Sequence, residues 1–386
     1  MKSRFKLPIL LLLITSLVAS AQQIEIYKNS FDATNLSTLE LDLNSTSINV
    51  QKSEDDKVHF NYSINFNNYS KKETQEIINK IEVSAEIEKG KLVLKSDSQS
   101  TRGDVVYSVE TLFGITFEGN NVTFKEPSTR KFRKGRQYFM SINDGSRIKS
   151  IKEYIKNIKA FDSKKKKKKI KMKNIKSYRT NFIIKIPKNL NLRATVINSN
   201  MTFNMDIASQ MILNARNSKL QFQSMSNNLN NFDVVNGEFR ASILQGGTYK
   251  FNHVSKVLLA KINNVNMDSE FADFRIGEIG KNVKIFDFNS IFWLHNFAVD
   301  FDEFTMNTEY SEINLFLPEK IEYNIQTFGH NTVHYWDNII TEIQPSRKNK
   351  SSKMMVIGEE TAPNKIKINS VHGIVRFGKD FIDFGE

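Results

Sequence analysis

The sequence predicts a mainly β protein whose larger part is a right-handed parallel β-solenoid, preceded by a small α+β lead-in domain. The first of three observations leads to this prediction, and the other two limit the class of protein. A strand-like motif recurs with a nearly constant period in the second half of the chain. The chain has no cysteine, so packing and backbone hydrogen bonds must stabilise it without disulfides. After the N-terminus, no apolar stretch approaches the roughly 18 residues of a membrane-spanning helix.

The repeated motif is a small residue followed by polar, apolar, polar and apolar positions. Such alternation is typical of a β-strand with one buried face. Seven copies follow one another at nearly even spacing: Ser199–Phe203, Ser218–Phe222, Gly237–Ala241, Ser255–Leu259, Ala272–Ile276, Ser290–Leu294 and Ser311–Leu315. The third and fifth positions are apolar in every copy, so we expect Leu220, Phe239, Val257 and Phe274 to stack as one buried column.

A period of about 17 to 21 residues indicates a coil of stacked turns, or rungs, because one turn cannot bury its own apolar face. Connections between parallel strands are nearly always right-handed. A β-sandwich is the alternative, but it does not require the same small residue in each copy. The second position of the motif alternates in charge, which favours this register because like charges on neighbouring strands repel: Lys219, Glu238, Lys256 and Asp273.

The repeat also predicts turns and further copies. Asparagine precedes the small residue in four copies, as a tight turn with positive φ favours: Asn198, Asn217, Asn236 and Asn289. Weaker copies are expected at Thr46–Val50, in a degraded unit from Gly329, and at Gly373–Phe377. The repeat domain is predicted to cover residues 181–386.

The N-terminus predicts export. Lys2, Arg4 and Lys6 precede an apolar run, Ile9–Val18, and the sequence Ala19-Ser20-Ala21 resembles a signal-peptidase site. We therefore expect a signal peptide at residues 1–21, a mature chain from Gln22, and a location in the periplasm, on the outer surface or outside the cell.

Residues 22–97 predict the lead-in domain. Alternating strands come first, and the stretch from Ser70 to Glu73 is a capping box that opens a short helix through Ile81. A hairpin-like pair of strands around Gly90 follows. This β-β-α-β-β domain is expected to cap the open end of the repeat, whose free edge would otherwise favour aggregation.

Residues 98–180 predict a partly flexible, basic insertion. Residues 105–126 favour a hairpin, and isoleucine spacing over residues 148–158 favours a helix. The stretch from Lys125 to Arg179 has 21 Lys+Arg and 4 acids, whereas the rest of the chain has 34 Lys+Arg and 38 acids. The positive charge therefore belongs to this segment, and six adjacent lysines within it are expected to be solvated.

This segment is the predicted partner site, with acidic glycans or other envelope polyanions as the expected ligands. Binding would be electrostatic and sensitive to salt, without sequence-specific nucleic-acid recognition. A solvated loop without a ligand is the alternative. The candidate residues are Arg130, Lys131, Arg133, Lys134, Arg136, Lys164, Lys165, Lys166, Lys167, Lys168, Lys169, Lys171 and Lys173.

No catalytic, cofactor or metal site is predicted. In a strand, His330 and His334 would share a face but lie about 13 Å apart, too far for one ion. Asp300, Asp302 and Glu303 favour an acidic loop between two rungs. The alternative is an active-site carboxylate cluster of the kind that β-helix polysaccharide lyases use, so a glycan lyase remains the enzymatic alternative.

The sequence resembles a known family in its opening strands, "LELDLNSTSINVQKSEDDKVHFNYSI", and in the units "NSKLQF", "NGEFRA" and "VHGIVRF". These are similar to the adhesin-like family of exported bacterial proteins with head-GIN or autotransporter-adhesin-like domains, frequent in Bacteroidetes. The resemblance covers residues 35–97 and 180–380. It implies a β-solenoid at the envelope or outside the cell that acts in binding or adhesion rather than as an enzyme.

Overall fold

The computed structural model describes residues 22–67, 69–98, 105–111, 115–118, 121–124, 136–142, 175–317, 322–336, 339–343 and 353–378. This part of the chain is mainly β and contains one helix, which confirms the predicted class at that level. Its residues form two compact units, drawn from 22–29, 60–82 and 98–182 and from 30–59, 83–97 and the residues after 182. The expected signal peptide lies outside the described residues.

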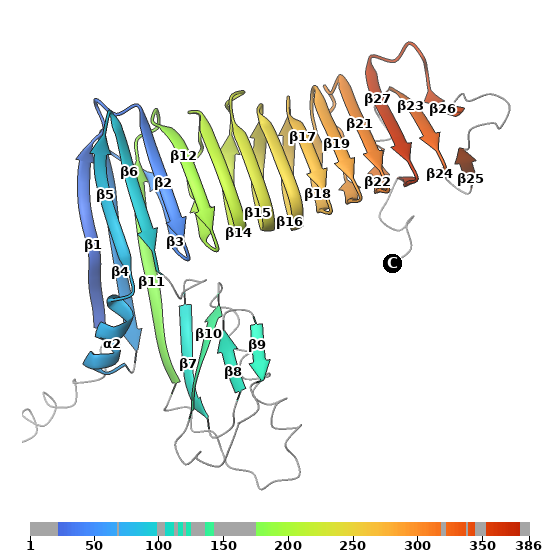
Figure 1. Cartoon of the computed structure of the whole chain (residues 1–386). Coiled ribbons are helices and arrows are strands. Elements are labelled where there is room, and N and C mark those ends of the chain that lie inside the picture. Colours follow the sequence, from blue (N-terminus) through green and yellow to red (C-terminus); the bar gives the residue numbers. More distant parts are fainter. Residues whose placement is uncertain are drawn as a thin grey trace, which may run out of the picture. The chain divides into compact units, whose positions relative to one another are not determined.

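The second unit contains a first series of strands that pair in parallel, each with the next (Figure 1). In order of pairing they are β6 (Lys91–Asp97), β2 (Thr38–Asn44), β12 (Asn191–Ile197), β14 (Met211–Met225), β15 (Asn231–Gln245), β16 (Thr248–Asn263), β17 (Asn266–Glu270), β19 (Val283–Phe288), β21 (Glu303–Glu309), β27 (Asn364–Val371) and β23 (Tyr323–His330).

A second parallel series follows a corner of the chain, and the long strands β14, β15 and β16 contribute to both series. In order of pairing it runs β11 (Ile175–Ile186), β3 (Ser47–Lys52), β13 (Asn200–Phe203), β14, β15, β16, β18 (Asp273–Ile279), β20 (Ile291–Leu294), β22 (Glu312–Phe316), β28 (Ile374–Gly378) and β24 (Thr332–Trp336). We call one strand of each series, with the corner between them, a rung.

The sheet is open and mixed, because antiparallel pairs occur beside the parallel ones. Strand β23 pairs with β26 (Lys353–Gly358) and β24 pairs with β25 (Ile339–Ile343), both antiparallel. These two pairs cover the last rung of the stack on its outer side.

The predicted register of the repeat is confirmed. Leu220 pairs with Phe239, Phe239 with Val257, and Val257 with Phe274. All four side chains are 0% exposed, so they form the expected buried column. The predicted charge alternation brings opposite charges together at its first step, where Lys219 Nζ lies 3.4 Å from a Glu238 carboxylate oxygen.

The predicted turns are confirmed as well. The asparagine before the small residue has a positive φ in all four copies, at Asn198, Asn217, Asn236 and Asn289. The small residue after the asparagine is a buried serine in three of these copies: Ser199, Ser218 and Ser290. Its hydroxyl has a second role. The backbone N–H of Ser199 donates to Ser218 Oγ on the next rung at 3.1 Å. A hydroxyl thus satisfies a buried backbone donor at the bend, which an alanine would leave unpaired.

Two details of the predicted repeat are wrong. Gly237 pairs with Val254, and the register shifts at Glu238, so Ser255 is an extra residue rather than the small residue of its copy. The stacking order also departs from chain order. The copy at residues 364–378 pairs with β21 and β22, and the copy from Gly329 lies beyond it. The weak copy at Thr46–Val50 does extend the series, through Ile48 and Met201.

The first unit contains the helix α2 (Lys71–Ile78), together with parts of β1 (Gln22–Asp32), β4 (Lys57–Asn67) and β11. The capping box is confirmed: the Ser70 N–H donates to a Glu73 carboxylate oxygen at 2.9 Å, and the Glu73 N–H donates to Ser70 Oγ. The helix ends at Ile78 rather than Ile81. The ring of Tyr62 stacks on Phe182, with centroids 4.6 Å apart.

The other predicted elements are partly described. In the insertion, β7 (Val105–Thr111) pairs antiparallel with β10 (Arg136–Ile142), and β8 (Ile115–Glu118) pairs antiparallel with β9 (Asn121–Phe124), as a hairpin requires. The helix expected at 148–158 lies outside the described residues. Strand β5 (Glu82–Glu88) precedes the turn at Gly90, where the predicted strand pair bends. The predicted domain boundaries stay a prediction.

Candidate functional site

Most of the predicted polyanion-binding segment, and all but one of its candidate residues, lie outside the described residues. Arg136 is the exception, since it begins β10, but its side chain is not described. The lysine run at 164–169 and the other candidate residues are outside the description. Polyanion binding by this segment therefore stays a prediction, and the candidate site described below comes from the second unit.

The acidic residues after β20 take part in contacts that join rungs. Asp300 pairs with Lys281 at 3.4 Å, and Asp302 Oδ1 accepts a hydrogen bond from the Asn282 N–H at 3.0 Å. The ammonium group of Lys367 lies 3.0 Å from Glu303, and its hydrogen bond lowers the pKa of that carboxyl group. Asp300 and Asp302 lie between β20 and β21, in agreement with the interpretation as an acidic loop between two rungs, whereas Glu303 begins β21.

His330 and His334 do not share a face, which corrects the expectation from strand geometry. The chain turns a corner between them at Asn331, where φ is 52°. His330 is therefore exposed, whereas His334 is 0% exposed and its pKa is lowered by burial to about 4. Across the described residues, no group of three or more His, Asp or Glu side chains is placed to hold a metal ion.

A column of outward side chains runs along the second strand series, one residue per rung, and it alternates in character. Arg240 pairs with Leu258, Leu258 with Arg275, and Arg275 with Trp293. We call Arg240, Leu258, Arg275 and Trp293 the arginine column. Cationic and apolar side chains thus follow one another at the rung spacing, about 4.8 Å.

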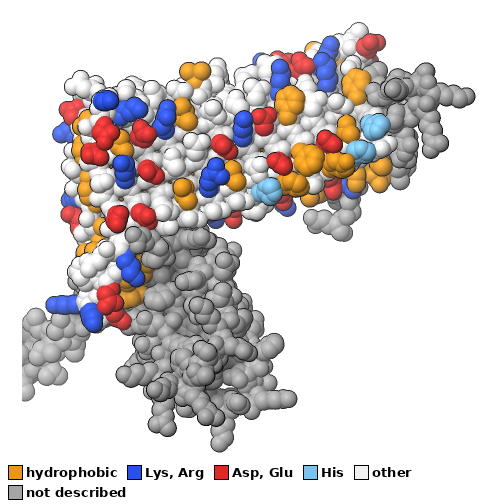
Figure 2. All heavy atoms as spheres, in the orientation of Figure 1, with side chains coloured by type: hydrophobic (Ala, Val, Ile, Leu, Met, Phe, Trp, Pro, Cys, Tyr) orange, Lys and Arg blue, Asp and Glu red, His pale blue; other side chains and the backbone are white. Residues whose placement is uncertain are grey.

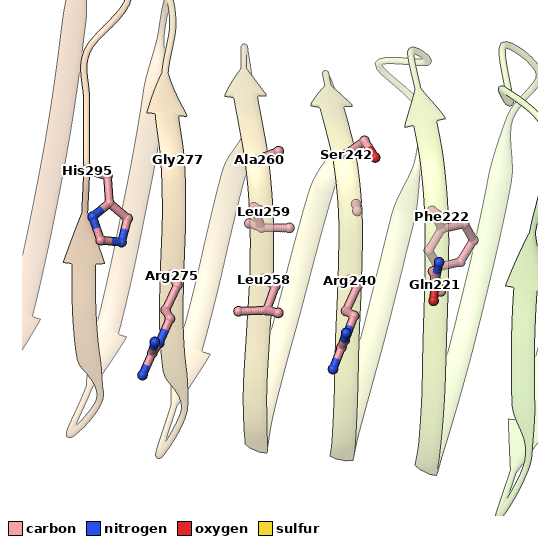
Figure 3. A pocket seen from close by; sticks show the side chains of 11 residues that line it. Gln221, Phe222, Arg240, Ser242, Leu258, Leu259, Ala260, Arg275, Gly277 and His295 are labelled. Carbon is pink, nitrogen blue, oxygen red and sulfur yellow. The ribbon is translucent and has the colours of Figure 1, made fainter. Parts of the chain in front are cut away.

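A shallow hollow of about 390 Å³ lies beside this column (Figure 3). One row of its lining is small, because Ser242, Ala260 and Gly277 occupy equivalent places on successive rungs. A Cβ at Gly277 would lie 2.6 Å from the carbonyl oxygen of Ala260, so no larger residue fits there without a backbone shift. His295 closes one end of the row, and its pKa is lowered by burial and by the charge of Arg275.

A second feature lies at the corner between the two strand series. The exposed rings there form a continuous line, which we call the aromatic corner: His253, Phe271, Phe288, Tyr310, His372 and His330. Neighbouring ring centroids in this line lie 4.8 to 5.8 Å apart. Figure 2 shows a face where exposed hydrophobic side chains gather beside histidines over the later rungs.

The rings of the aromatic corner are exposed although they are large and apolar. Phe271 is 39% exposed, Phe288 38% and Tyr310 51%. Next to Phe288 in the chain, the carboxylate of Asp287 accepts hydrogen bonds from Ser311 Oγ at 2.5 Å and from the Ser290 N–H at 3.2 Å. Burial raises the pKa of Asp287 despite these bonds. A partly buried set of hydrogen bonds thus joins Asp287 to the serines that follow the corner on two rungs.

Four of these aromatic residues have a positive φ, which disfavours Phe271 and Tyr310, whereas histidine, like asparagine, is enriched in that conformation. Phe271, Tyr310, His253 and His372 all have φ between 50° and 58°. A bulky side chain at positive φ is uncommon and costs about 1 to 3 kcal/mol, whereas asparagine tolerates it. Earlier rungs do place asparagine at this corner, as at Asn217. Phe271 and Tyr310 therefore keep exposed rings against the local backbone preference, while Asn289 and Asn331 occupy the corner on other later rungs.

The sequence contained a signal for the aromatic corner that the repeat alignment left unused. The residue before the small residue is asparagine in four copies, but it is Phe271 and Tyr310 in two others. Those exceptions mark the corner. His372 is marked in the same way, because it precedes Gly373 of a predicted copy, but its neighbours could not be predicted since that copy enters the stack out of chain order. His253 could not be found in this way, because the register shift at Glu238 displaces it.

Comparison with known proteins assigns no family. No protein-family profile matches the chain, and no curated protein matches it. It is similar to a solved structure described as a putative cell adhesion protein from Clostridium sporogenes, at 10% identity, with a TM-score of 0.17, over 93% of this chain and 99% of that chain. A TM-score this low carries no argument about fold or function. The resemblance to the adhesin-like family stays a prediction.

Within the described residues, no helix combines the length and apolar character that crossing a membrane requires.

Proposed function

We propose that this chain is an exported, non-enzymatic binding protein of the cell envelope or cell surface, adhesin-like in its role, whose repeat unit is a right-handed parallel β-solenoid. The two parallel series support the solenoid, because over the central rungs their strands pair at the period of the sequence repeat. Right-handed connection is the strong preference for parallel crossovers. Export is supported by the signal-peptide pattern at residues 1–21.

The observation that carries the binding role is the aromatic corner. Contiguous exposed apolar surface on a protein usually marks an interaction site. Here two of its rings, Phe271 and Tyr310, are bulky side chains at positive φ, and strained residues retained on a surface point to function rather than to stability. Neither burial nor backbone preference explains Phe271 and Tyr310, which leaves ring–ring contact within the corner and contact with a partner as physical reasons. We propose the partner.

The proposed partner is a glycan chain. The apolar faces of sugar rings stack on aromatic rings, and the hydroxyl groups can bind polar side chains at the same time. The aromatic rings recur at the rung spacing, which is close to the length of one sugar unit in an extended chain. Asparagine and histidine side chains beside the rings, such as Asn331 and His372, supply hydrogen-bonding groups.

The test replaces Phe271 and Tyr310 by asparagine, the residue that earlier rungs use at this corner. Because asparagine suits the positive φ, the melting temperature of Phe271→Asn/Tyr310→Asn should be equal to or higher than that of the wild type. Binding to an array of microbial and plant polysaccharides should fall sharply. The control is Leu229→Ala/Val299→Ala, which removes exposed apolar side chains elsewhere in the repeat unit.

Unchanged binding by the asparagine variant would overturn the proposal, as would equal losses in the variant and the control. A lower melting temperature would show that the rings stabilise the corner and that their exposure needs no partner.

A further inference from the structure

We infer that the arginine column and the adjoining hollow bind an acidic polysaccharide in which a charged sugar alternates with an uncharged one. This inference rests on the proposed function, because it assumes that the repeat unit binds glycans. It differs from the aromatic corner, since it concerns another row of side chains and determines the charge pattern of the ligand.

The first support is the spacing of the cations. Arg240 and Arg275 are separated by the single rung that contributes Leu258, so their strands are two rung spacings apart, or about 10 Å. In an extended glycan with one acidic group per disaccharide, successive acidic groups are also two sugar units apart. The two arginines can therefore contact consecutive acidic groups of one chain that runs along the stack.

The second support is what lies between and beside the arginines. Leu258 separates them, and Trp293 follows Arg275 on the next rung. Apolar and aromatic side chains favour the C–H faces of uncharged sugars. A ligand charged at every unit would place a carboxylate over Leu258, where it would lose water without gaining a partner. The column therefore discriminates between charge patterns as well as between charged and neutral chains.

The third support is the availability of the guanidinium groups. Arg275 is exposed and has no carboxylate partner within the part of the chain that the structure describes. Arg240 is 39% exposed and lies 3.4 Å from Glu238, a long contact that a ligand carboxylate could replace. In Figure 3 both arginine side chains extend in the same direction from neighbouring parts of the sheet. An arginine fork suits a carboxylate or sulfate, since both can accept two parallel hydrogen bonds.

The hollow gives the ligand room to lie close to the sheet. The row formed by Ser242, Ala260 and Gly277 has no long side chain, and Gly277 cannot be enlarged without displacing Ala260. Its volume, about 390 Å³, falls in the range of small-ligand sites. A pyranose ring can therefore settle beside the arginines rather than rest on top of them.

Trp293 provides a local readout, because the chain contains two tryptophans and Trp336 can be removed. In a Trp336→Phe background of the full chain, the emission of Trp293 is titrated with three probes. These are a hyaluronan octasaccharide, in which glucuronate alternates with N-acetylglucosamine, its carboxyl-reduced form, and an octamer of mannuronate, which is charged at every unit.

We expect the hyaluronan octasaccharide to bind at least about tenfold more tightly than either other probe, since a charged hydrogen-bonded pair is commonly worth that factor or more. Arg240→Ala/Arg275→Ala should remove this preference, and Arg275→Lys should retain part of it because charge remains without the fork. Arg193→Ala is the matched control, an exposed arginine on the first strand series, and it should bind like the wild type.

Equal affinities for the three probes, or unchanged binding by the double arginine variant, would overturn the inference. So would binding of a dT oligonucleotide as tightly as hyaluronan, which would show attraction to charge alone. The corner variant Phe271→Asn/Tyr310→Asn separates the two proposals. If it loses polysaccharide binding while the arginine variant does not, the proposed function stands and this inference fails. The reverse result supports binding by the arginine column and refutes the binding role proposed for the aromatic corner.

Discussion

Protonation of the buried His334 should destabilise the end of the repeat unit in mild acid. The side chain is 0% exposed, and burial lowers its pKa from 6.5 to about 4. The unfolded chain therefore binds a proton between those two values while the folded chain does not. Stability is fully present above pH 6.5 and falls as the pH drops toward 4. The difference between the two pKa values corresponds to about 3 kcal/mol in full, of which about 2.5 kcal/mol is lost at about pH 4.5.

The comparison is with His334→Phe, which keeps a ring of similar size against Phe377, whose centroid lies 6.4 Å from that of His334. Both proteins carry Trp293→Phe, so that Trp336, on the same strand β24, is the sole tryptophan reporter of this end of the unit. Urea unfolding at about pH 7.5 and about pH 4.5 should show that the His334 protein loses about 2.5 kcal/mol more than the Phe variant. Parallel losses in the two proteins would refute the reasoning, because other groups would then account for the acid sensitivity.

Four further outcomes are expected. Phe239→Ala should lower the free energy of unfolding by about 3 to 5 kcal/mol, measured by urea titration, because its fully buried ring packs in the central column. Gly237→Ala should lower the melting temperature in circular dichroism, since a Cβ would lie 2.0 Å from the carbonyl oxygen of Ser218 at a φ of 99°; an unchanged value would contradict the corner geometry. Deleting 163–173 should remove most heparin binding and leave thermal stability nearly unchanged, and the wild-type affinity should fall with salt with a log–log slope of about −0.7 to −0.9 per contact. Terminal sequencing of the exported protein should begin at Gln22, and retention of Met1 would contradict the predicted signal peptide.

The regular features of the fold could be predicted because each depends on a few neighbouring residues. The burial of Phe239 follows from alternation along a strand, whose side chains point to opposite faces with a period of two. The positive φ at Asn217 follows from the tolerance of asparagine for that conformation. The capping box at Ser70 is likewise a contact between residues of a single helical turn. None of these predictions needed knowledge of distant parts of the chain.

The candidate site could be predicted only in part. The residues of the arginine column occupy the same outward position of successive copies, so their alignment in one row was implicit in the repeat. The aromatic corner was not implicit in the repeat, because the positions of two of its members depend on a register shift and on the stacking order. His253 reaches the corner through an extra residue at Ser255, and His372 reaches it because its rung pairs with β21, which lies much earlier in the chain.

The sequence by itself determined the period of the repeat, the buried and outward faces of each strand, and the tight corners, since these follow from side-chain size, polarity and backbone preference over a few residues. Only the tertiary structure decided which rungs are neighbours. Parallel strands pair through the same backbone groups whatever their side chains are. A rung can therefore pair with any free strand edge that the connecting chain can reach, provided that its side chains fill the core there. That choice places the copy at 364–378 next to β21 and β22 and brings His372 into contact with Tyr310, which completes a line of rings that the order of the residues does not show.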